Sequence, residues 1–183
     1  MLSCRCVGWV AVVALIGSAQ PAEAQDKPAR LPPLVTTARV QLQLAGAETI
    51  LAAAKLKAAT MDLKVNIAIV DDGGHLLTFA RMDGARPASA YTALTKATAA
   101  ATFRSETGAL PAKGEPDLLL SLSLQNAAAA SGGKMTTLKG GVPIVVNGQV
   151  VGAVGVGGGT GEQDAEIARA GIQALLDKLT DKK

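Results

Sequence analysis

A single histidine, His75, limits the metal chemistry open to this chain of 183 residues. Zinc and iron sites that take two or three histidines from one chain are excluded. One imidazole is enough as the axial ligand of a haem iron, a position that tyrosine and methionine also fill. The alternative for His75 is an exposed polar residue at the edge of a turn. The other conventional axial candidates beyond the first 24 residues are Tyr91, Met61, Met82 and Met135.

Hydroxyl and cationic side chains recur on one predicted helix at the spacing of a helix face. Thr98 and Thr102 belong to a stripe of threonines at three- and four-residue steps, with Lys96 beside it. Threonine is a poor helix former unless its hydroxyl finds a partner. The stripe therefore indicates either close helix packing or the polar wall of a ligand groove. No Ser-His-Asp or Cys-His arrangement is indicated, because the acids nearest to His75 belong to a turn sequence.

The glycine-rich stretch 152–161 lies where a phosphate-binding loop would lie, after a strand and before a helix. It does not fit a nucleotide-binding fingerprint, because no G-x-G-x-x-G register is present and no lysine completes a P-loop. Glu162 and Asp164 at the start of the helix would also repel phosphate. We expect these glycines to let a strand pass close to a helix. The alternative is that N–H groups at the helix start remain free for a carboxylate.

The composition indicates one domain with a core of small aliphatic residues. Hydrophobic residues make up 49% of the chain and aromatic residues 2%, so Ala, Val, Leu, Ile and Gly must fill the core. The net charge is +3, and the basic residues are scattered without interleaved aromatics, which argues against a nucleic-acid platform. Because few large apolar side chains are available to a stand-alone core, we expect a homo-oligomer.

The first 24 residues predict a cleaved signal peptide. Arg5 precedes an apolar run over 7–16, and Ala22-Glu23-Ala24 has the small-x-small pattern of a cleavage site. The run is too short for a stable membrane anchor, since a spanning helix needs about 20 apolar residues. Both cysteines precede the predicted cut, so the mature chain has no thiol. We expect a periplasmic or secreted protein with a flexible leader over 25–35 and a single domain over 36–183.

Periodicity predicts an α/β (α+β) domain in which helices pack on the faces of an antiparallel sheet of about five strands. Four segments have helical character: 36 or 37 to 60, 88–103, 117–125 and a closing helix with a Thr160–Gln163 capping box. Five segments have strand character: 65–70, 76–80, 134–138, 144–146 and 149–156. Residues 71–74 predict a tight turn, and Asn147-Gly148 predicts a type I′ hairpin.

Four motifs resemble the haem-binding protein S / glycolate-operon accessory protein family, whose domain also occurs at the C-terminus of some cobalamin adenosyltransferase proteins. In order, they are VDDGGHLLTFARMDGA at 70–85, Lys96-Ala97, GGVPI at 140–144, and GAVGV at 152–156 with EQD at 162–164. The resemblance covers about residues 36–179. It implies a profilin-like fold with a five-stranded antiparallel sheet and compact oligomers, octamers among them. Exported members imply haem binding and haem or iron sensing outside the cell. The family often has serine where this chain has Gly157.

The resemblance and the residues together predict an exported, non-enzymatic protein that binds haem or another tetrapyrrole and acts in haem or iron sensing or handling. Haem needs an apolar slot and cations for its propionates, and Arg81 and Lys96 are best placed to supply them. We expect the site between the 81–83 strand end and the helix face that carries Lys96. The predicted haem-binding residues are His75, Arg81, Met82, Lys96, Thr98 and Thr102, with His75 as the metal ligand.

Two other functions fit the same residues. In one, the chain is an enzyme or accessory subunit acting on a small organic acid, with Arg81 as carboxylate clamp and Asp83 or His75 as acid and base. In the other, it is a purely structural oligomer in which residues 81–84 shape a subunit interface.

Overall fold

The computed structural model describes residues 39–111 and 113–181, which form four helices and four strands. The predicted signal peptide and leader lie outside these residues. No helix within the described ranges is long and apolar enough to cross a membrane. The elements are α1 (Leu44–Thr60), β1 (Asn66–Asp71), β2 (Leu76–Arg81), α2 (Ser89–Phe103), α3 (Leu118–Ala130), β3 (Gly141–Val146), β4 (Gln149–Gly157) and α4 (Gly161–Thr180).

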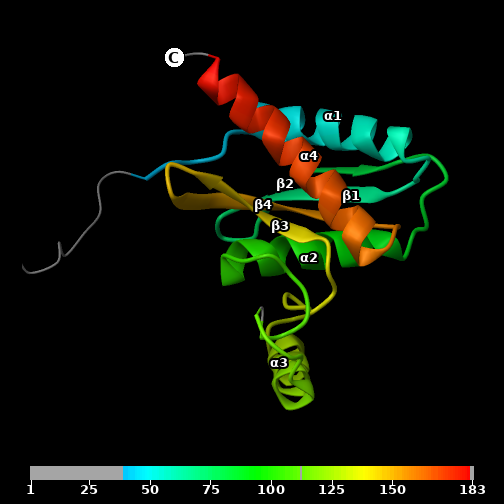
Figure 1. The fold of residues 1–183 in the computed structure, drawn as a ribbon, viewed down its shortest axis with the longest axis vertical. Coiled ribbons are helices and arrows are strands. Elements are labelled where there is room, and N and C mark those ends of the chain that lie inside the picture. The colour runs from blue at the N-terminus through cyan, green and yellow to red at the C-terminus, as the bar shows by residue number, and fades with distance from the viewer. Residues whose placement is uncertain (1–38, 112, 182–183) are drawn as a thin grey trace, which may run out of the picture. The chain divides into compact units, whose positions relative to one another are not determined.

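The four strands form one antiparallel sheet in the order β2-β1-β4-β3, within a mixed α/β fold (Figure 1). The prediction of a fifth strand at 134–138 is wrong, because that segment pairs with no strand of the described ranges. Hydroxyl groups satisfy part of its backbone instead. The Leu138 N–H donates to Thr136 Oγ1 (3.1 Å), and its carbonyl accepts from Thr107 Oγ1 (2.7 Å). β3 is therefore an edge strand, where Pro143, which has no N–H, is accommodated.

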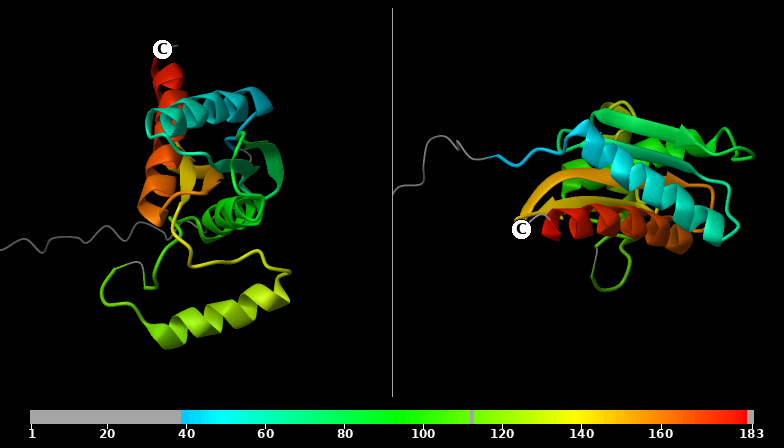
Figure 2. Two further views of the ribbon diagram at one scale, coloured as in Figure 1. Left: turned by 90° about the vertical axis from the view of Figure 1, so that its right-hand side faces the viewer. Right: turned by 90° about the horizontal axis from the view of Figure 1, so that it is seen from above.

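Helices cover both faces of the sheet (Figure 2): α1 and α4 lie on one face, and α2 lies on the other. The larger core lies under α1 and α4, and its largest fully buried side chains include Ile50, Ile67 and Ile167. The smaller core lies under α2 and consists of alanines with Val70. Small side chains on α2 let its backbone approach the sheet closely.

Two glycines of β4 are required by this close approach. A Cβ atom added at Gly155 would lie 2.1 Å from the carbonyl oxygen of Ala93, and one at Gly157 would lie 2.6 Å from Thr92 Oγ1. Both distances are far below van der Waals contact. The expectation that the glycine-rich stretch lets a strand pass close to a helix is therefore confirmed.

Local sequence signals hold at two further positions and fail at a third. Asn147 and Gly148 have φ values of 51° and 74°, as a type I′ turn requires. The predicted capping box is present at the start of α4, where the side chains of Thr160 and Gln163 each accept the other's backbone N–H. α1, however, begins at Leu44 rather than at 36 or 37, because its N-cap Gln43 is extended.

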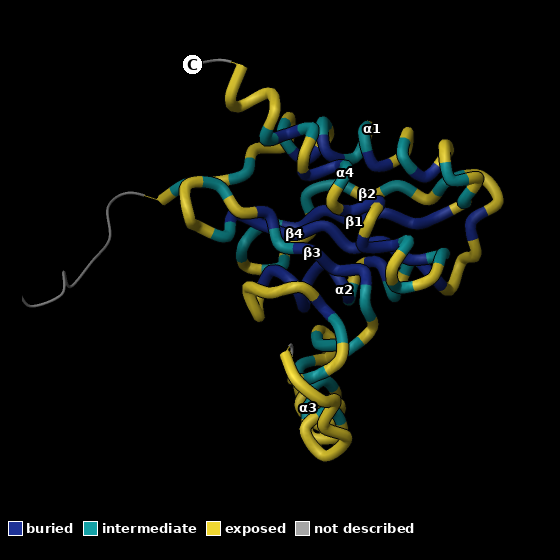
Figure 3. The backbone as a smooth tube through the Cα atoms, in the orientation of Figure 1, coloured by how far each residue is buried: buried dark blue, intermediate teal, exposed yellow. Residues whose placement is uncertain are grey.

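α3 and its flanking segments project away from the sheet (Figures 1 and 3). None of its side chains is buried, and the helix carries no charged residue. Leu118 and Leu119 are 72% and 76% exposed. This projecting arm is the part of the described chain with the least support from the core.

Candidate functional site

Two adjoining cavities lie on either side of the extended segment 39–43. They share the lining residues Gln41, Leu42, Gln43 and Val151. Each has a volume of about 480 Å³, within the usual range for small-molecule sites. Since this segment forms a wall of both cavities, its extended conformation before α1 determines their shape.

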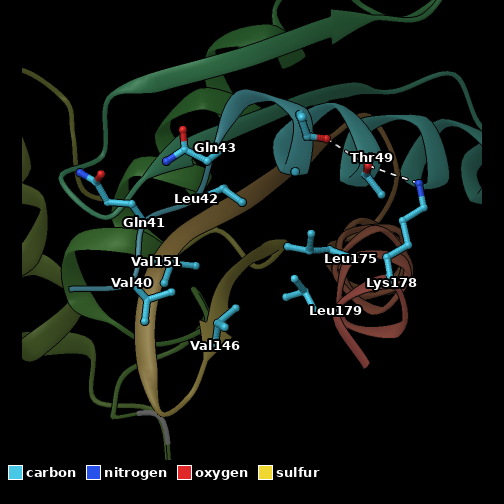
Figure 4. A pocket seen from close by; sticks show the side chains of 12 residues that line it. Val40, Gln41, Leu42, Gln43, Thr49, Val146, Val151, Leu175, Lys178 and Leu179 are labelled. Atoms are coloured by element: carbon cyan, nitrogen blue, oxygen red, sulfur yellow. Dashed lines mark hydrogen bonds between the residues drawn. The ribbon is translucent and has the colours of Figure 1, made fainter. Parts of the chain in front are cut away.

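The first, the apolar cavity, opens between the start of α1, the β3–β4 hairpin and the end of α4 (Figure 4). Its only charged lining residue is Lys178, whose Nζ lies 3.5 Å from Thr49 Oγ1. This cavity offers an apolar surface with one cation at its edge. Its apolar side chains include Val40, Leu42, Val146, Val151, Leu175 and Leu179.

The second, the His75 cavity, lies beside the turn between β1 and β2. It contains the chain's histidine together with one guanidinium and two carboxylates. Arg39 forms an ion pair with Asp72 at this cavity. Leu42, Leu44 and Leu77 supply apolar wall. The cavity thus combines an imidazole, a cation and aliphatic side chains.

The β1–β2 turn places the His75 imidazole beside the Asp71 carboxylate. The Asp71 carboxylate accepts the backbone N–H groups of Gly73 (2.9 Å) and His75 (2.8 Å), and lies 3.3 Å from His75 Nδ1. A carboxylate on Nδ1 favours a proton at that nitrogen and leaves Nε2 as the lone-pair donor, the arrangement usual for metal-bound histidines. The His75 side chain is 81% exposed, so a ligand can reach it.

The pKa of Asp71 lies below its ordinary value of 3.8. Partial burial by itself would raise this pKa. The hydrogen bonds from the backbone N–H groups of His75 and Gly73 outweigh that effect, and the imidazole of His75 lowers the pKa further. The carboxylate is therefore ionised at neutral pH and available to hold the imidazole.

Thr98 and Thr102 lie beneath this turn rather than in a ligand groove. Thr98 Oγ1 donates to the Gly74 carbonyl (3.2 Å), and Thr102 Oγ1 donates to the Thr98 carbonyl one helical turn back (2.8 Å). A Cβ at Gly74 would lie 2.9 Å from the Thr98 methyl group. These two threonines therefore pack α2 against the turn that carries His75.

Arg81 and Met82 lie at the opposite end of β2 from His75. Five residues of extended chain lie between His75 and Arg81, so the two residues are about 20 Å apart along the strand. Arg81 is exposed, while Met82 packs on the larger core. The structure thus does not bring these two residues together with the histidine.

Lys96 is buried and faces a third cavity, here called the Lys96 cavity. Its Nζ donates to Asp164 Oδ2 (2.7 Å) and to the Val156 carbonyl (2.9 Å), and the residue is 5% exposed. The Lys96 cavity has no lining residue in common with the other two. Lys96 therefore occupies a different site from His75.

Several residues of the adjoining cavities were missed by sequence reasoning. Arg39, Leu42 and Lys178 lie more than 30 residues from His75 in sequence, and helical periodicity had included Leu42 in a helix. The alternation of apolar and polar residues over 40–44 could have indicated an extended segment. No comparable signal marked Lys178. No group of three or more metal-ligating side chains occurs within the described part of the chain.

Comparisons with known proteins agree on one family. A family model described as haem degrading protein HbpS-like matches residues 42–173. Protein GlcG of Escherichia coli K12 is 42% identical over 110 residues, which cover 60% of this chain and 76% of GlcG. An uncharacterized 15.0 kDa protein of Citrobacter freundii is 34% identical over 137 residues, which cover 74% of this chain and 93% of that protein.

Solved structures of similar fold include one that is a complex with haem. HbpS of Streptomyces reticuli, as a double mutant, has a TM-score of 0.63 at 28% identity and covers 92% of this chain and 99% of its own. A complex of PduOC with haem has a TM-score of 0.60 at 25% identity and covers 74% and 95%. The protein ORFY of Klebsiella pneumoniae has a TM-score of 0.66 at 30% identity and covers 79% and 98%.

Proposed function

This chain belongs to the HbpS-like family, and we propose that it binds haem at the His75 cavity, with His75 as the axial ligand of the iron. One observation carries the proposal: the only histidine of the chain lines a cavity with aliphatic walls and is oriented by a carboxylate. The PduOC relative, which is known in complex with haem, supports the choice of ligand.

The residues of the cavity fit such a group. Haem presents a flat apolar ring, two propionates and an iron that takes an axial nitrogen. Leu42, Leu44 and Leu77 supply apolar contact, and His75 Nε2 supplies the nitrogen. Arg39 supplies a forked cation for a propionate. It would exchange its ion pair with Asp72 for that contact.

Each of these residues has a distinct role. Asp71 keeps the Nδ1 proton of His75 in place and so directs Nε2 outward. Thr98 supports the turn from below through its bond to the Gly74 carbonyl. Arg39 would offer its guanidinium to a propionate. When bound, haem supplies an iron centre and a strong visible absorption that reports its axial ligand.

Titration with haemin tests the proposal. The wild type is expected to give a saturable Soret shift, and His75→Ala is expected to bind more weakly with a different Soret position. Tyr91→Phe is the matched control, since it removes another potential iron ligand that is 79% exposed and lies outside the three cavities. Identical spectra and affinities for His75→Ala and the wild type would refute the assignment of the iron ligand.

Arg81→Ala distinguishes this location from the one predicted by sequence. At the far end of β2, Arg81 cannot contact a haem held by His75, so its removal is expected to leave haemin affinity unchanged. A loss of affinity in Arg81→Ala with none in His75→Ala would place the haem at the other end of the hairpin.

We also propose that the protein is exported and works as a homo-oligomer in haem or iron handling. The pattern of residues 1–24 supports export, and N-terminal sequencing of the mature protein is expected to begin at Gln25. The exposed leucines of α3 support assembly, because an uncharged helix without a covering element leaves apolar surface in water. Light scattering is expected to give a multiple of the monomer mass, and a stable monomer would contradict assembly.

A further inference from the structure

We propose that the Lys96 cavity is a second binding site, selective for a small monocarboxylate anion, in which Arg86, Ser89 and Lys96 contact the ligand. The cavity has a volume of about 340 Å³, near the lower end of the range for small-molecule sites. It lies between the N-terminal half of α2 and the turn that joins β4 to α4. Its lining residues are Arg86, Ala88, Ser89, Thr92, Lys96, Leu138, Gly158, Gly159 and Asp164.

Ser89 provides the first sign of a ligand. The residue is only 6% exposed and lines the cavity, yet its hydroxyl bonds to no other described residue. Within the described residues, Asn66 Oδ1 is the one fully buried side-chain oxygen or nitrogen without a partner, so the Ser89 oxygen is open to the cavity and free to bond a group inside it. The neighbouring hydroxyl of Thr92 is already used, because it donates to the Ser89 carbonyl (3.0 Å). A ligand oxygen in the cavity would give Ser89 the partner that the protein does not supply.

Lys96 provides a second unused donor. An ammonium group has three N–H bonds, and only two of them are bound, by Asp164 and the Val156 carbonyl. Each oxygen of the Asp164 carboxylate already accepts one hydrogen bond, Oδ2 from Lys96 and Oδ1 from the Gly159 N–H (2.9 Å). The third N–H of this buried ammonium therefore remains for a ligand.

The electrostatics of the cavity favour an anion. Lys96 and Asp164 neutralise each other, whereas Arg86 has no ion-pair partner in residues 39–111 and 113–181. The lining residues thus carry a net charge of +1. The first turn of α2 adds to this, because it contains no acidic residue and its N-cap Ala88 makes no side-chain capping bond.

The donors match a carboxylate in charge and in hydrogen-bonding type. The guanidinium of Arg86 offers two parallel N–H bonds, the fork that pairs with the two oxygens of a carboxylate. Its backbone is held by the fully buried Asn66, whose Nδ2 donates to the Arg86 carbonyl (3.0 Å). A single net positive charge suits a monoanion, and the small volume excludes a porphyrin. The site is therefore independent of the haem proposal.

Amide-resolved NMR titration with sodium acetate and sodium lactate tests this site. Saturable shifts are expected at the backbone amides of Ser89 and Gly159, and Arg86→Ala and Ser89→Ala are expected to weaken binding about tenfold or more. Arg104→Asn is the matched control: it removes an exposed arginine at the other end of α2, and asparagine tolerates its left-handed backbone (φ 56°).

Three results would overturn the proposal. They are the absence of saturation at millimolar carboxylate, an equal loss of affinity in Arg104→Asn, and saturation by inorganic phosphate with none by acetate. Circular dichroism of each variant verifies folding before titration. Because the haemin titration concerns His75 and a different cavity, its failure would leave these outcomes unchanged.

Discussion

Removal of one partner from the buried Lys96–Asp164 ion pair is expected to destabilise the domain more than any surface substitution. The two residues are 5% and 1% exposed, and the pair joins α2 to the start of α4 across the end of β4. In Lys96→Met the Asp164 carboxylate stays buried without its cation. In Asp164→Leu the ammonium is left uncompensated, and the Gly159 N–H also loses its acceptor.

The magnitude follows from the burial of both groups. Breaking a buried ion pair on one side typically costs about 3–5 kcal/mol, because the remaining charge is desolvated without compensation. With a urea dependence of about 2 kcal/mol per molar, a loss of about 4 kcal/mol lowers the unfolding midpoint by about 2 M. The double variant Lys96→Met/Asp164→Leu is expected to recover part of this loss, since no buried charge remains.

Urea denaturation followed by circular dichroism measures these changes. The control is Lys57→Ala, which breaks an ion pair of similar length between α1 and α4 (Lys57 Nζ to Glu166 Oε1, 2.6 Å) whose side chains are 32% and 55% exposed. This substitution is expected to cost less than about 1 kcal/mol. A single variant of the buried pair with an equally small effect, or a double variant worse than both singles, would refute the reasoning.

Three further predictions concern local features of the fold. Gly155→Ala is expected to lower the unfolding free energy of the domain by more than about 2 kcal/mol in the same assay. The control Gly108→Ala places no atom within 4 Å of the new Cβ and is expected to change stability little. Equal effects of the two variants would contradict the close approach of α2 to β4. Thr160→Ala, which removes the capping hydroxyl of α4, is expected to cost about 1 kcal/mol, and an unchanged midpoint would show that the cap contributes nothing. Because folding lowers the pKa of Asp71, the ionised carboxylate stabilises the folded state above its ordinary pKa of 3.8, and this stabilisation is lost as the pH falls below that value. The difference in unfolding free energy between the wild type and Asp71→Ala is therefore expected to shrink on acidification. A difference that grows on acidification would contradict the lowered pKa.

The resemblance to the family, read from four motifs, is confirmed by the comparisons. The fold agrees with the prediction in its antiparallel sheet and in the helices that cover it, but not in the number of strands.

The absence of the predicted fifth strand from the described residues has a physical cause. Residues 134–138 have local strand character, but whether a strand forms depends on a partner with free N–H and C=O groups. Two hydroxyl groups bind that backbone instead: that of Thr136, within the segment itself, and that of Thr107, which is 31 residues away in sequence from Leu138 and belongs to no local pattern.

In the candidate sites too, local features could be predicted from the sequence and the grouping of distant residues could not. The sequence predicted the tight turn at 71–74 and assigned its acidic residues to the turn, whereas the structure also places the Asp71 carboxylate beside His75 Nδ1. The predicted grouping of His75 with Arg81 and Lys96 depended on how β2 and α2 lie relative to each other. In the structure these three residues occupy separate places.

What the sequence determined by itself was therefore local. The Asn147-Gly148 turn and the Thr160 capping box each depend on atoms within a few residues, and the single histidine limits the metal chemistry whatever the fold. Only the tertiary structure decided which side chains share a cavity. Lys96 and Asp164 are 68 residues apart in sequence, and they pair because a glycine-lined strand lets α2 and α4 approach the same end of the sheet. Contacts of this kind arise from packing between elements, and no period or motif within one element encodes them.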